Sequence, residues 1–205
     1  PMSKTIQGRT FTIVFNGEIY NTDELKKELT KHGYTFSTTS DTEVLLWAYI
    51  YYGPDFVRQV NGIFSFAIYD HAEAAIFLYR DPLYYTLLAD QTLVFASERK
   101  ALFCYPGTFP RIDRQGLCEI FALGPSKTPG RGVFKGIDEL KPGHYIRYDR
   151  FGCSTTCYFR IQSMPHIDDY QTTVEKTSDL LNAAVKRQIV SDVPVCTFLS
   201  GGIDS

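Results

Sequence analysis

The sequence predicts an α+β domain followed by the start of an α/β domain, and three patterns support this order. Short β-rich runs separated by turn residues recur at residues 63–69, 75–80, 83–88 and 92–96. Runs of this length and spacing are typical of an antiparallel meander. Helical patterns cover residues 23–31 and 44–52. A helical pattern over 169–190 then leads into a continuous apolar run over 193–199, as in a helix followed by a buried parallel strand.

The first strand, over residues 10–15, leads into the polar stretch Asn16-Gly17-Glu18. We interpret this stretch as a functional turn after the strand, because helix-start chemistry follows at Asn21. A side-chain amide beside a glycine N–H offers two donors to a developing oxyanion, the glycine allows close approach of substrate, and Glu18 could hold a cationic amine. For an isolated Asn-Gly pair, a hairpin turn between two strands is the favoured alternative.

Ser40-Asp41-Thr42-Glu43 has the pattern of a capping box, with Ser40 as the N-cap and Glu43 reaching back to it. It opens an amphipathic helix over 44–52, after a first helix over 23–31. By position alone, Asp41 favours the helix dipole, an interaction worth under about 1 kcal/mol.

Further elements follow the predicted sheet. Residues 98–103 and 113–123 have helical patterns, and the second has Asp113 as its cap and Gly124 as its terminator. Residues 145–148 are predicted to form another strand.

Residues 162–167 are the best candidate for a linker, because strand-like sequence ends before them and a long helix follows. In that helix apolar residues recur at helical spacing, which predicts one buried face. They are Val174, Leu181, Val185 and Ile189.

The apolar run over 193–199 leads into Ser200-Gly201-Gly202-Ile203-Asp204-Ser205, which suits a phosphate-binding loop. Glycines let backbone N–H groups converge on an anion, and hydroxyl groups add donors. The pattern is not a Walker A motif, because no lysine follows the glycines. A plain Ser/Gly-rich turn explains these residues equally well.

Composition limits the partners of the chain. Its 205 residues carry a net charge of -2, which gives no field for gripping nucleic acid or an anionic membrane, and no apolar run reaches membrane-spanning length. The five cysteines are scattered, unlike a secreted disulfide framework, and Cys196 falls in an apolar run typical of a core position. We therefore expect a cytoplasmic protein with reduced thiols.

Four motifs taken together resemble the glutamine-hydrolysing asparagine synthetases. They are Asn16–Asn21, Ser40–Glu43, Asn61–Ala67 and Ser200–Ser205. The resemblance implies an Ntn-hydrolase-like αββα sandwich of two antiparallel sheets, followed by the first helix and strand of an α/β adenine-nucleotide-binding domain. It implies a type-2 glutamine amidotransferase domain over 1–161, the linker over 162–167, and the start of an ATP-pyrophosphatase synthetase domain over 168–205.

In that family, glutamine hydrolysis in the first domain supplies ammonia through a channel to the second. There aspartate and ATP form β-aspartyl-AMP, and ammonia converts it to asparagine, with AMP and pyrophosphate as the other products. The resemblance implies that Asn16 and Gly17 stabilise the oxyanion and that Glu18 and Asp41 position glutamine. Asp41 would bind the α-amino group of glutamine.

The resemblance also implies an ATP site in the second domain. Ser200, Gly201, Gly202 and Ser205 would cradle the phosphates, and the backbone near Phe198 would meet the adenine. Asp204 would help to bind Mg²⁺, which prefers hard oxygen ligands. The resemblance is compatible with a homodimer and implies no nucleic-acid or membrane partner.

The sequence departs from the family in two places. Residue 1 is proline, where the family has an N-terminal cysteine nucleophile, so we expect this polypeptide to be a fragment that lacks glutaminase activity. After Arg80-Asp81 the family usually has an insert, whereas this chain continues directly with Pro82 and is about five residues shorter at this turn. Two alternatives stay open: an adenylating ligase similar to β-lactam synthetases, whose acceptor residues would lie after Ser205, or a non-catalytic scaffold with the glutaminase fold.

Overall fold

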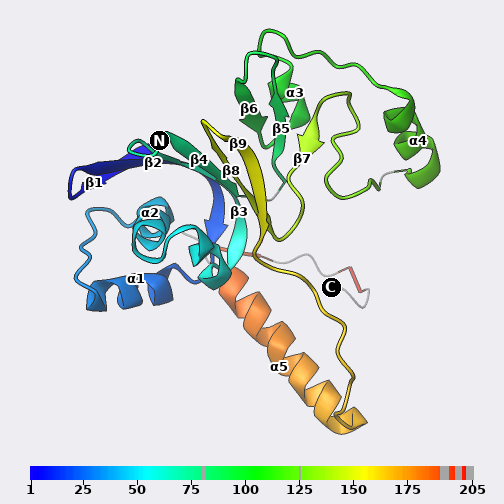
Figure 1. The fold of residues 1–205 in the computed structure, drawn as a ribbon. Helices are drawn as coiled ribbons and strands as arrows, with labels where there is room; N and C mark the ends of the chain where they lie inside the picture. Colours follow the sequence, from blue (N-terminus) through cyan, green and yellow to red (C-terminus); the bar gives the residue numbers. More distant parts are fainter. Residues whose placement is uncertain (80–81, 125, 190–193, 197–199, 202–205) are drawn as a thin grey trace. The chain divides into compact units, whose positions relative to one another are not determined.

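A computed structural model describes residues 1–79, 82–124, 126–189, 194–196 and 200–201. The chain divides into two compact units, residues 1–161 and 162–205. Among the described residues, every strand lies in the first unit (Figure 1).

The first unit contains two antiparallel sheets. The larger has the strand order β1-β2-β3-β4-β8-β9, with β1 (Met2–Ile6), β2 (Arg9–Ile19), β3 (Gly62–Asp70), β4 (Ala75–Tyr79), β8 (His144–Asp149) and β9 (Gly152–Cys157). The smaller has the order β6-β5-β7, with β5 (Tyr84–Leu87), β6 (Leu93–Ala96) and β7 (Asp138–Glu139).

The two antiparallel sheets that the resemblance implied are confirmed, but the single meander predicted over residues 63–96 is wrong. β4 pairs with β8, while β5 and β6 belong to the smaller sheet. Local β patterning predicts the strands, but it does not say which strands pair, because pairing depends on contacts far along the chain. The predicted short turn at Arg80-Asp81 lies outside the described residues.

The first unit also contains helical elements. The elements are α1 (Thr22–Lys31), α2 (Asp41–Tyr52), the 3₁₀ helix η1 (Pro54–Gln59), α3 (Arg99–Leu102) and α4 (Arg114–Leu123). Asp113 caps α4 as predicted, accepting a hydrogen bond from the N–H of Gly116 at 2.9 Å, and Gly124 ends it.

Three apolar clusters show how the layers of the first unit are stacked. The largest joins the larger sheet to α1 and α2. A second, which includes Ala67, Leu83 and Ile146, lies between the two sheets. The third joins the smaller sheet to α3 through Tyr84 and Leu102. The order is therefore helices, larger sheet, smaller sheet, helix (Figure 1).

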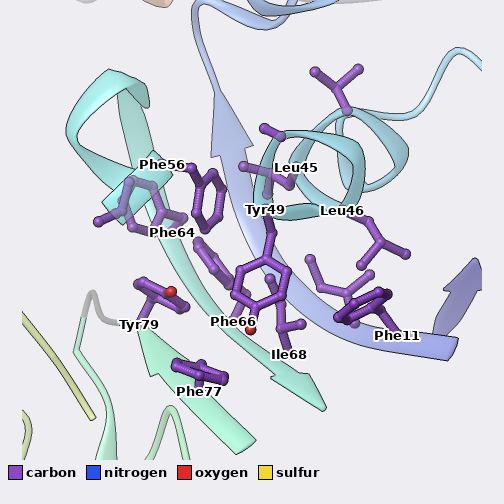
Figure 2. Packing of buried hydrophobic residues seen from close by; sticks show 14 of the residues in the cluster. Phe11, Leu45, Leu46, Tyr49, Phe56, Phe64, Phe66, Ile68, Phe77 and Tyr79 are labelled. Carbon is purple, nitrogen blue, oxygen red and sulfur yellow. The ribbon is translucent and has the colours of Figure 1, made fainter. Parts of the chain in front are cut away.

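Aromatic rings fill the largest cluster (Figure 2). Phe66 of β3 stacks on Tyr79 of β4 with ring centroids 4.5 Å apart, and Phe56 of η1 meets Tyr79 edge-on at 5.5 Å. The buried Tyr79 hydroxyl donates to the carbonyl of Pro54 at 2.9 Å, so burial leaves its polar end satisfied. This cluster holds β2, β3 and α2 as one body.

The prediction that α2 is amphipathic is wrong. Leu45, Leu46 and Ala48 are fully buried although they follow one another around the helix. They are covered because α2 contacts β2, α1 and η1, and Trp47 packs against Tyr34 at 5.1 Å. A helix enclosed on several sides is apolar nearly all round.

The second unit contains α5 (Tyr170–Gln188), capped by Asp169, whose carboxylate accepts a hydrogen bond from the N–H of Thr172 at 2.8 Å. The helix is present as predicted, but its predicted buried face is not. Val174, Leu181, Val185 and Ile189 are 45–64% exposed, because no other described element of this unit packs on them. Cys196, predicted as a core residue, is also exposed.

No helix in the described part of the chain is both long and apolar enough to cross a membrane. The sequence patterns missed β9, whose residues 153–157 are small or polar and exposed. Such an edge strand is held by its pairing with β8 and carries no alternating apolar signal.

Candidate functional site

The predicted turn at Asn16-Gly17-Glu18 is wrong, and so is the hairpin alternative. All three residues lie within β2 and pair with β3, Asn16 opposite Ser65, Gly17 opposite Phe64. Pairing continues to Ile19 before α1 begins. The stretch is therefore the end of a long central strand, a rigid place from which to present a polar side chain.

Gly17 is required by the backbone of the neighbouring strand. Its φ of +147° lies in the region that side chains disfavour, and a Cβ atom there would approach the carbonyl oxygen of Ile63 to 2.2 Å. Gly62, across the ladder, would meet the carbonyl oxygen of Glu18 at the same distance. We predicted that Gly17 allows substrate to approach the backbone closely. The close approach of β2 and β3 is a separate reason why glycine is required here.

Asn21 connects two of the sequence motifs. Its side-chain oxygen accepts a hydrogen bond from the N–H of Asn61 at 2.8 Å, and its amide nitrogen donates to the carbonyl of Gln59 at 2.8 Å. It occupies the N-cap position of α1 but makes no side-chain capping bond. Asn21 thus fixes the start of β3 beside the end of β2, a role that a capping pattern does not reveal.

Asn16 lines a cavity of about 160 Å³ between the two sheets. The larger sheet lines it with Asn16 and with Val14, Phe15, Ser65, Phe66 and Ala67, and Leu83, Phe95, Ala96 and Ser97 complete it. Ser65 is only 6% exposed and stands opposite Asn16 in the ladder. An amide and two hydroxyl groups against an apolar wall can bind the polar end of a small ligand.

Sequence reasoning did not single out Ser65 and Ser97. The alternation of β3 contained a usable signal, since it places Ser65 on the same face as Ala67 and against Asn16. A larger cavity of about 760 Å³ lies beside α3 and α4 and contains none of the predicted site residues. We therefore assign the candidate site to the smaller cavity.

Asp41 lies on another element, the first turn of α2. Ser40 caps this helix as predicted, its hydroxyl accepting a hydrogen bond from the N–H of Thr42 at 3.2 Å. The Asp41 carboxylate is half-buried, and the Thr42 hydroxyl lies 3.5 Å from it. Among the described residues, Asp41 makes no hydrogen bond or ion pair with Glu18 or Asn16, although α2 packs against β2.

The predicted capping box is wrong for Glu43. Its side chain does not reach the N–H of Ser40, which donates instead to the hydroxyl of Thr38 at 3.2 Å. Glu43 is fully buried and binds the segment before the helix. The pattern was misleading because a buried set of donors outcompetes the single exposed N–H that a capping box satisfies.

In the second unit only Ser200 and Gly201 of the predicted nucleotide loop are described. Gly201 has a φ of +79°, which favours glycine at this position. Phe198, Gly202, Asp204 and Ser205 lie outside the described residues.

The sequence matches two family profiles. The glutamine amidotransferase domain matches residues 1–159, and asparagine synthase matches residues 176–205. The chain is 48% identical over its whole length to the Bacillus subtilis protein named asparagine synthetase [glutamine-hydrolyzing] 3, of which it covers 34%. It is 36% identical to the one numbered 1, covering 97% of this chain and 32% of that protein. The chain thus spans about a third of the length of these curated relatives.

Solved structures agree at the level of the fold. Glutamine phosphoribosylpyrophosphate amidotransferase from B. subtilis superposes with a TM-score of 0.54 at 20% identity, over 76% of this chain and 30% of that one. A regulatory enzyme of purine biosynthesis gives a TM-score of 0.53 at 19% identity, over 78% of this chain and 31% of that one. With a profile match over most of its residues and a shared architecture, the chain belongs to the glutamine amidotransferase domain family.

Proposed function

We propose that this chain is part of a glutamine-hydrolysing asparagine synthetase. Its relatives carry that name, and both matching profiles occur in the order that such an enzyme requires. The enzyme would take ammonia from glutamine and, with aspartate and ATP, form asparagine, AMP and pyrophosphate through β-aspartyl-AMP. Residues 1–161 would be the amidotransferase domain, 162–167 the linker, and 168–205 the start of the synthetase domain.

The observation that carries the proposal is the position of Asn16. Its amide lines a cavity between the sheets beside a glycine at which the backbone leaves no room for a side chain. Donors held on a central strand need no reorganisation when charge develops on a carbonyl oxygen. We assign the amide of Asn16 and the N–H of Gly17 to the tetrahedral oxyanion formed during glutamine hydrolysis. Glu18 and Asp41 would position glutamine, and Asp41 would bind the α-amino group of glutamine.

In the second unit we assign Ser200, Gly201, Gly202 and Ser205 to the phosphates of ATP, and the backbone near Phe198 to the adenine. Asp204 has the hard oxygen donor that Mg²⁺ prefers when it is shared with phosphates, and the ion would neutralise their charge. From the resemblance we also propose a cytoplasmic location and a homodimer, with glutamine, aspartate and ATP as substrates.

The test is Asn16→Ala in the full-length product of the gene. Loss of one oxyanion donor should lower glutamine-dependent asparagine formation by roughly 10²–10³-fold. Ammonia-dependent asparagine formation should stay nearly unchanged, because free ammonia bypasses hydrolysis. Both rates are measured as asparagine formed per enzyme, with glutamine or ammonium chloride as the nitrogen source.

Two further variants sharpen this test. Asn16→Asp keeps the shape of the side chain but replaces the donor with a negative charge, so it should be at least as damaging as alanine. Asn182→Ala removes an exposed amide from α5 and should change neither rate. Equal loss with glutamine and ammonia would assign Asn16 to folding instead. Absence of asparagine formation in the unaltered protein would favour a different acceptor or a scaffold.

A further inference from the structure

The most extensively hydrogen-bonded carboxylate among the described residues is Glu43, at the third position of α2. It is fully buried. The backbone N–H of Ser37 donates to it at 2.9 Å and that of Thr38 at 2.6 Å. The hydroxyl groups of the same two residues donate at 2.8 and 2.7 Å, and Lys4 completes the set at 2.6 Å. We call Lys4, Ser37, Thr38 and Glu43 the Glu43 cluster.

The Glu43 cluster connects three separate parts of the first unit. Lys4 comes from β1, Glu43 from α2, and Ser37 with Thr38 from the exposed segment between α1 and α2. The Lys4 ammonium also lies 5.3 Å from the ring centroid of Trp47, one turn further along α2. The cluster therefore ties an otherwise exposed segment to the helix that it precedes.

Burial alone would raise the pKa of Glu43, but the hydrogen bonds from Lys4, Ser37 and Thr38 outweigh it and hold that pKa well below its ordinary value. The carboxylate is thus charged and fully partnered. A buried charge contributes less to stability than a well-packed apolar side chain of the same size would. Capping the helix does not require it either, since Ser40 already does so.

What the Glu43 cluster does fix is the path of residues 37–40. Thr38 binds Glu43 through its N–H and hydroxyl and at the same time accepts a hydrogen bond from the N–H of Ser40. Ser40 in turn caps the first turn, which begins with Asp41. A chain of hydrogen bonds therefore runs from Glu43 to the residue immediately before Asp41.

We propose that Glu43 is a positioning residue for glutamine, acting through Asp41. By fixing residues 37–40, it sets the place of the Asp41 carboxylate that would hold the α-amino group. This inference rests on the proposed function, in which Asp41 binds glutamine. Recognition of the α-amine thus depends on a buried carboxylate that does not contact the substrate.

The test is Glu43→Gln in the full-length protein, with two amide substrates. Glutamine carries the α-amine, and glutaramate is the same chain without it. In the variant, one side-chain NH₂ faces the N–H donors of Ser37 or Thr38, so the segment should lose its fixed position. We expect the KM for glutamine to rise about tenfold or more, the loss typical of a hydrogen bond to a charged group. The kcat for glutamine and both constants for glutaramate should change less than about threefold.

A double-mutant cycle adds a readout that a merely structural role would not move. In an Asp41→Asn background the amine contact is already lost, so Glu43→Gln should have little further effect on the KM for glutamine. A full additional effect in that background, or equal damage with both substrates, would overturn the proposal.

Ser37→Ala is the milder variant if Glu43→Gln does not fold. It removes one hydroxyl donor and leaves the carboxylate buried with its other partners. It should raise the KM for glutamine, by a smaller factor, and leave glutaramate unaffected; an unchanged KM in this variant overturns the proposal. If the unaltered protein does not hydrolyse glutamine, the proposed function fails and this inference with it; if it does, a negative result concerns Glu43 alone.

Discussion

α2 and α5 both begin with a side-chain N-cap, yet only α2 packs against other elements of its unit. Ser40 and Asp169 each cap the first turn through a side-chain oxygen. Most residues in the middle of α2 are buried, whereas α5 has no buried residue. The caps and the periodicity of a helix are local properties of its sequence. Burial depends on partners, which α2 finds in β2, α1 and η1, and which α5 does not find among the described residues of its unit.

The comparison extends to the two units that contain these helices. The first has three apolar clusters and a candidate site whose parts it supplies itself. The second presents a capped helix with an apolar stripe and part of a glycine loop. The two units should therefore respond differently to equivalent substitutions.

The largest difference is expected from Asp204→Asn in the full-length protein. If Asp204 binds Mg²⁺ as proposed, its loss removes a metal ligand beside the phosphates of ATP, an effect worth several kcal/mol. Pyrophosphate release with aspartate, ATP and ammonia should fall by roughly 10²–10³-fold. Glutamine hydrolysis should continue, because the proposed glutamine residues lie on β2 and α2 in the first unit.

Asp204→Asn has a matched control in Asp179→Asn, which removes a carboxylate from α5 of the same unit. The control should leave pyrophosphate release unchanged. Pyrophosphate release at the unaltered rate in Asp204→Asn would mean that Ser200–Ser205 is a plain turn.

A pair of leucine substitutions tests the packing difference directly. Leu45→Ala in α2 empties a fully buried position and should lower the free energy of unfolding of the 205-residue chain by about 2–5 kcal/mol. Leu181→Ala in α5 removes a side chain that is 64% exposed and should change it by less than about 0.5 kcal/mol. Urea denaturation followed by circular dichroism measures both. Comparable losses would show that α5 is packed in solution.

The smallest expected effect is on the stability of the folded chain at acidic pH. Hydrogen bonds hold the pKa of Glu43 below its ordinary value of 4.5, so its contribution to stability is present above about that pH and is lost as the pH falls further. The stability difference between the unaltered chain and Glu43→Gln should therefore shrink on acidification below pH 4.5.

Asp169 gives the contrast with Glu43 in α5. Its pKa is also lowered, by the N–H of Thr172, but its side chain is solvent-exposed. Asp169→Asn should therefore change the acid profile far less than Glu43→Gln. A difference between the unaltered chain and Glu43→Gln that is independent of pH would show that the pKa of Glu43 is the same in the folded and unfolded chains, contrary to the buried, hydrogen-bonded carboxylate.

Much of this fold follows from local sequence patterns. The caps at Ser40 and Asp113 were predicted, because side-chain capping is settled within three residues. The resemblance predicted two sheets. The local patterns predicted the strands but did not assign them to the correct sheet. The partner of β4 is β8, about seventy residues further along by residue number, and no local rule reaches that far.

The candidate site was predicted in its residue types but not in its geometry. Asn16 and Gly17 were singled out, yet the stretch was interpreted as a turn because helix-start chemistry follows it at Asn21. The opposing strand, with Gly62 in register with Ile19, allows the backbone to stay extended instead. Ser65 and the true partners of Glu43 are tertiary facts, since their neighbours are distant in the chain.

The Glu43 cluster also gives this protein an optical reporter. Trp47 is the single tryptophan of the sequence, and it lies one turn after Glu43 with the Lys4 ammonium 5.3 Å from its ring centroid. The emission of an indole ring responds to a nearby cation and to the water around it. Movement of Lys4 away from Glu43 would therefore change the intrinsic fluorescence, so the segment before α2 can be followed during glutamine binding without any attached dye.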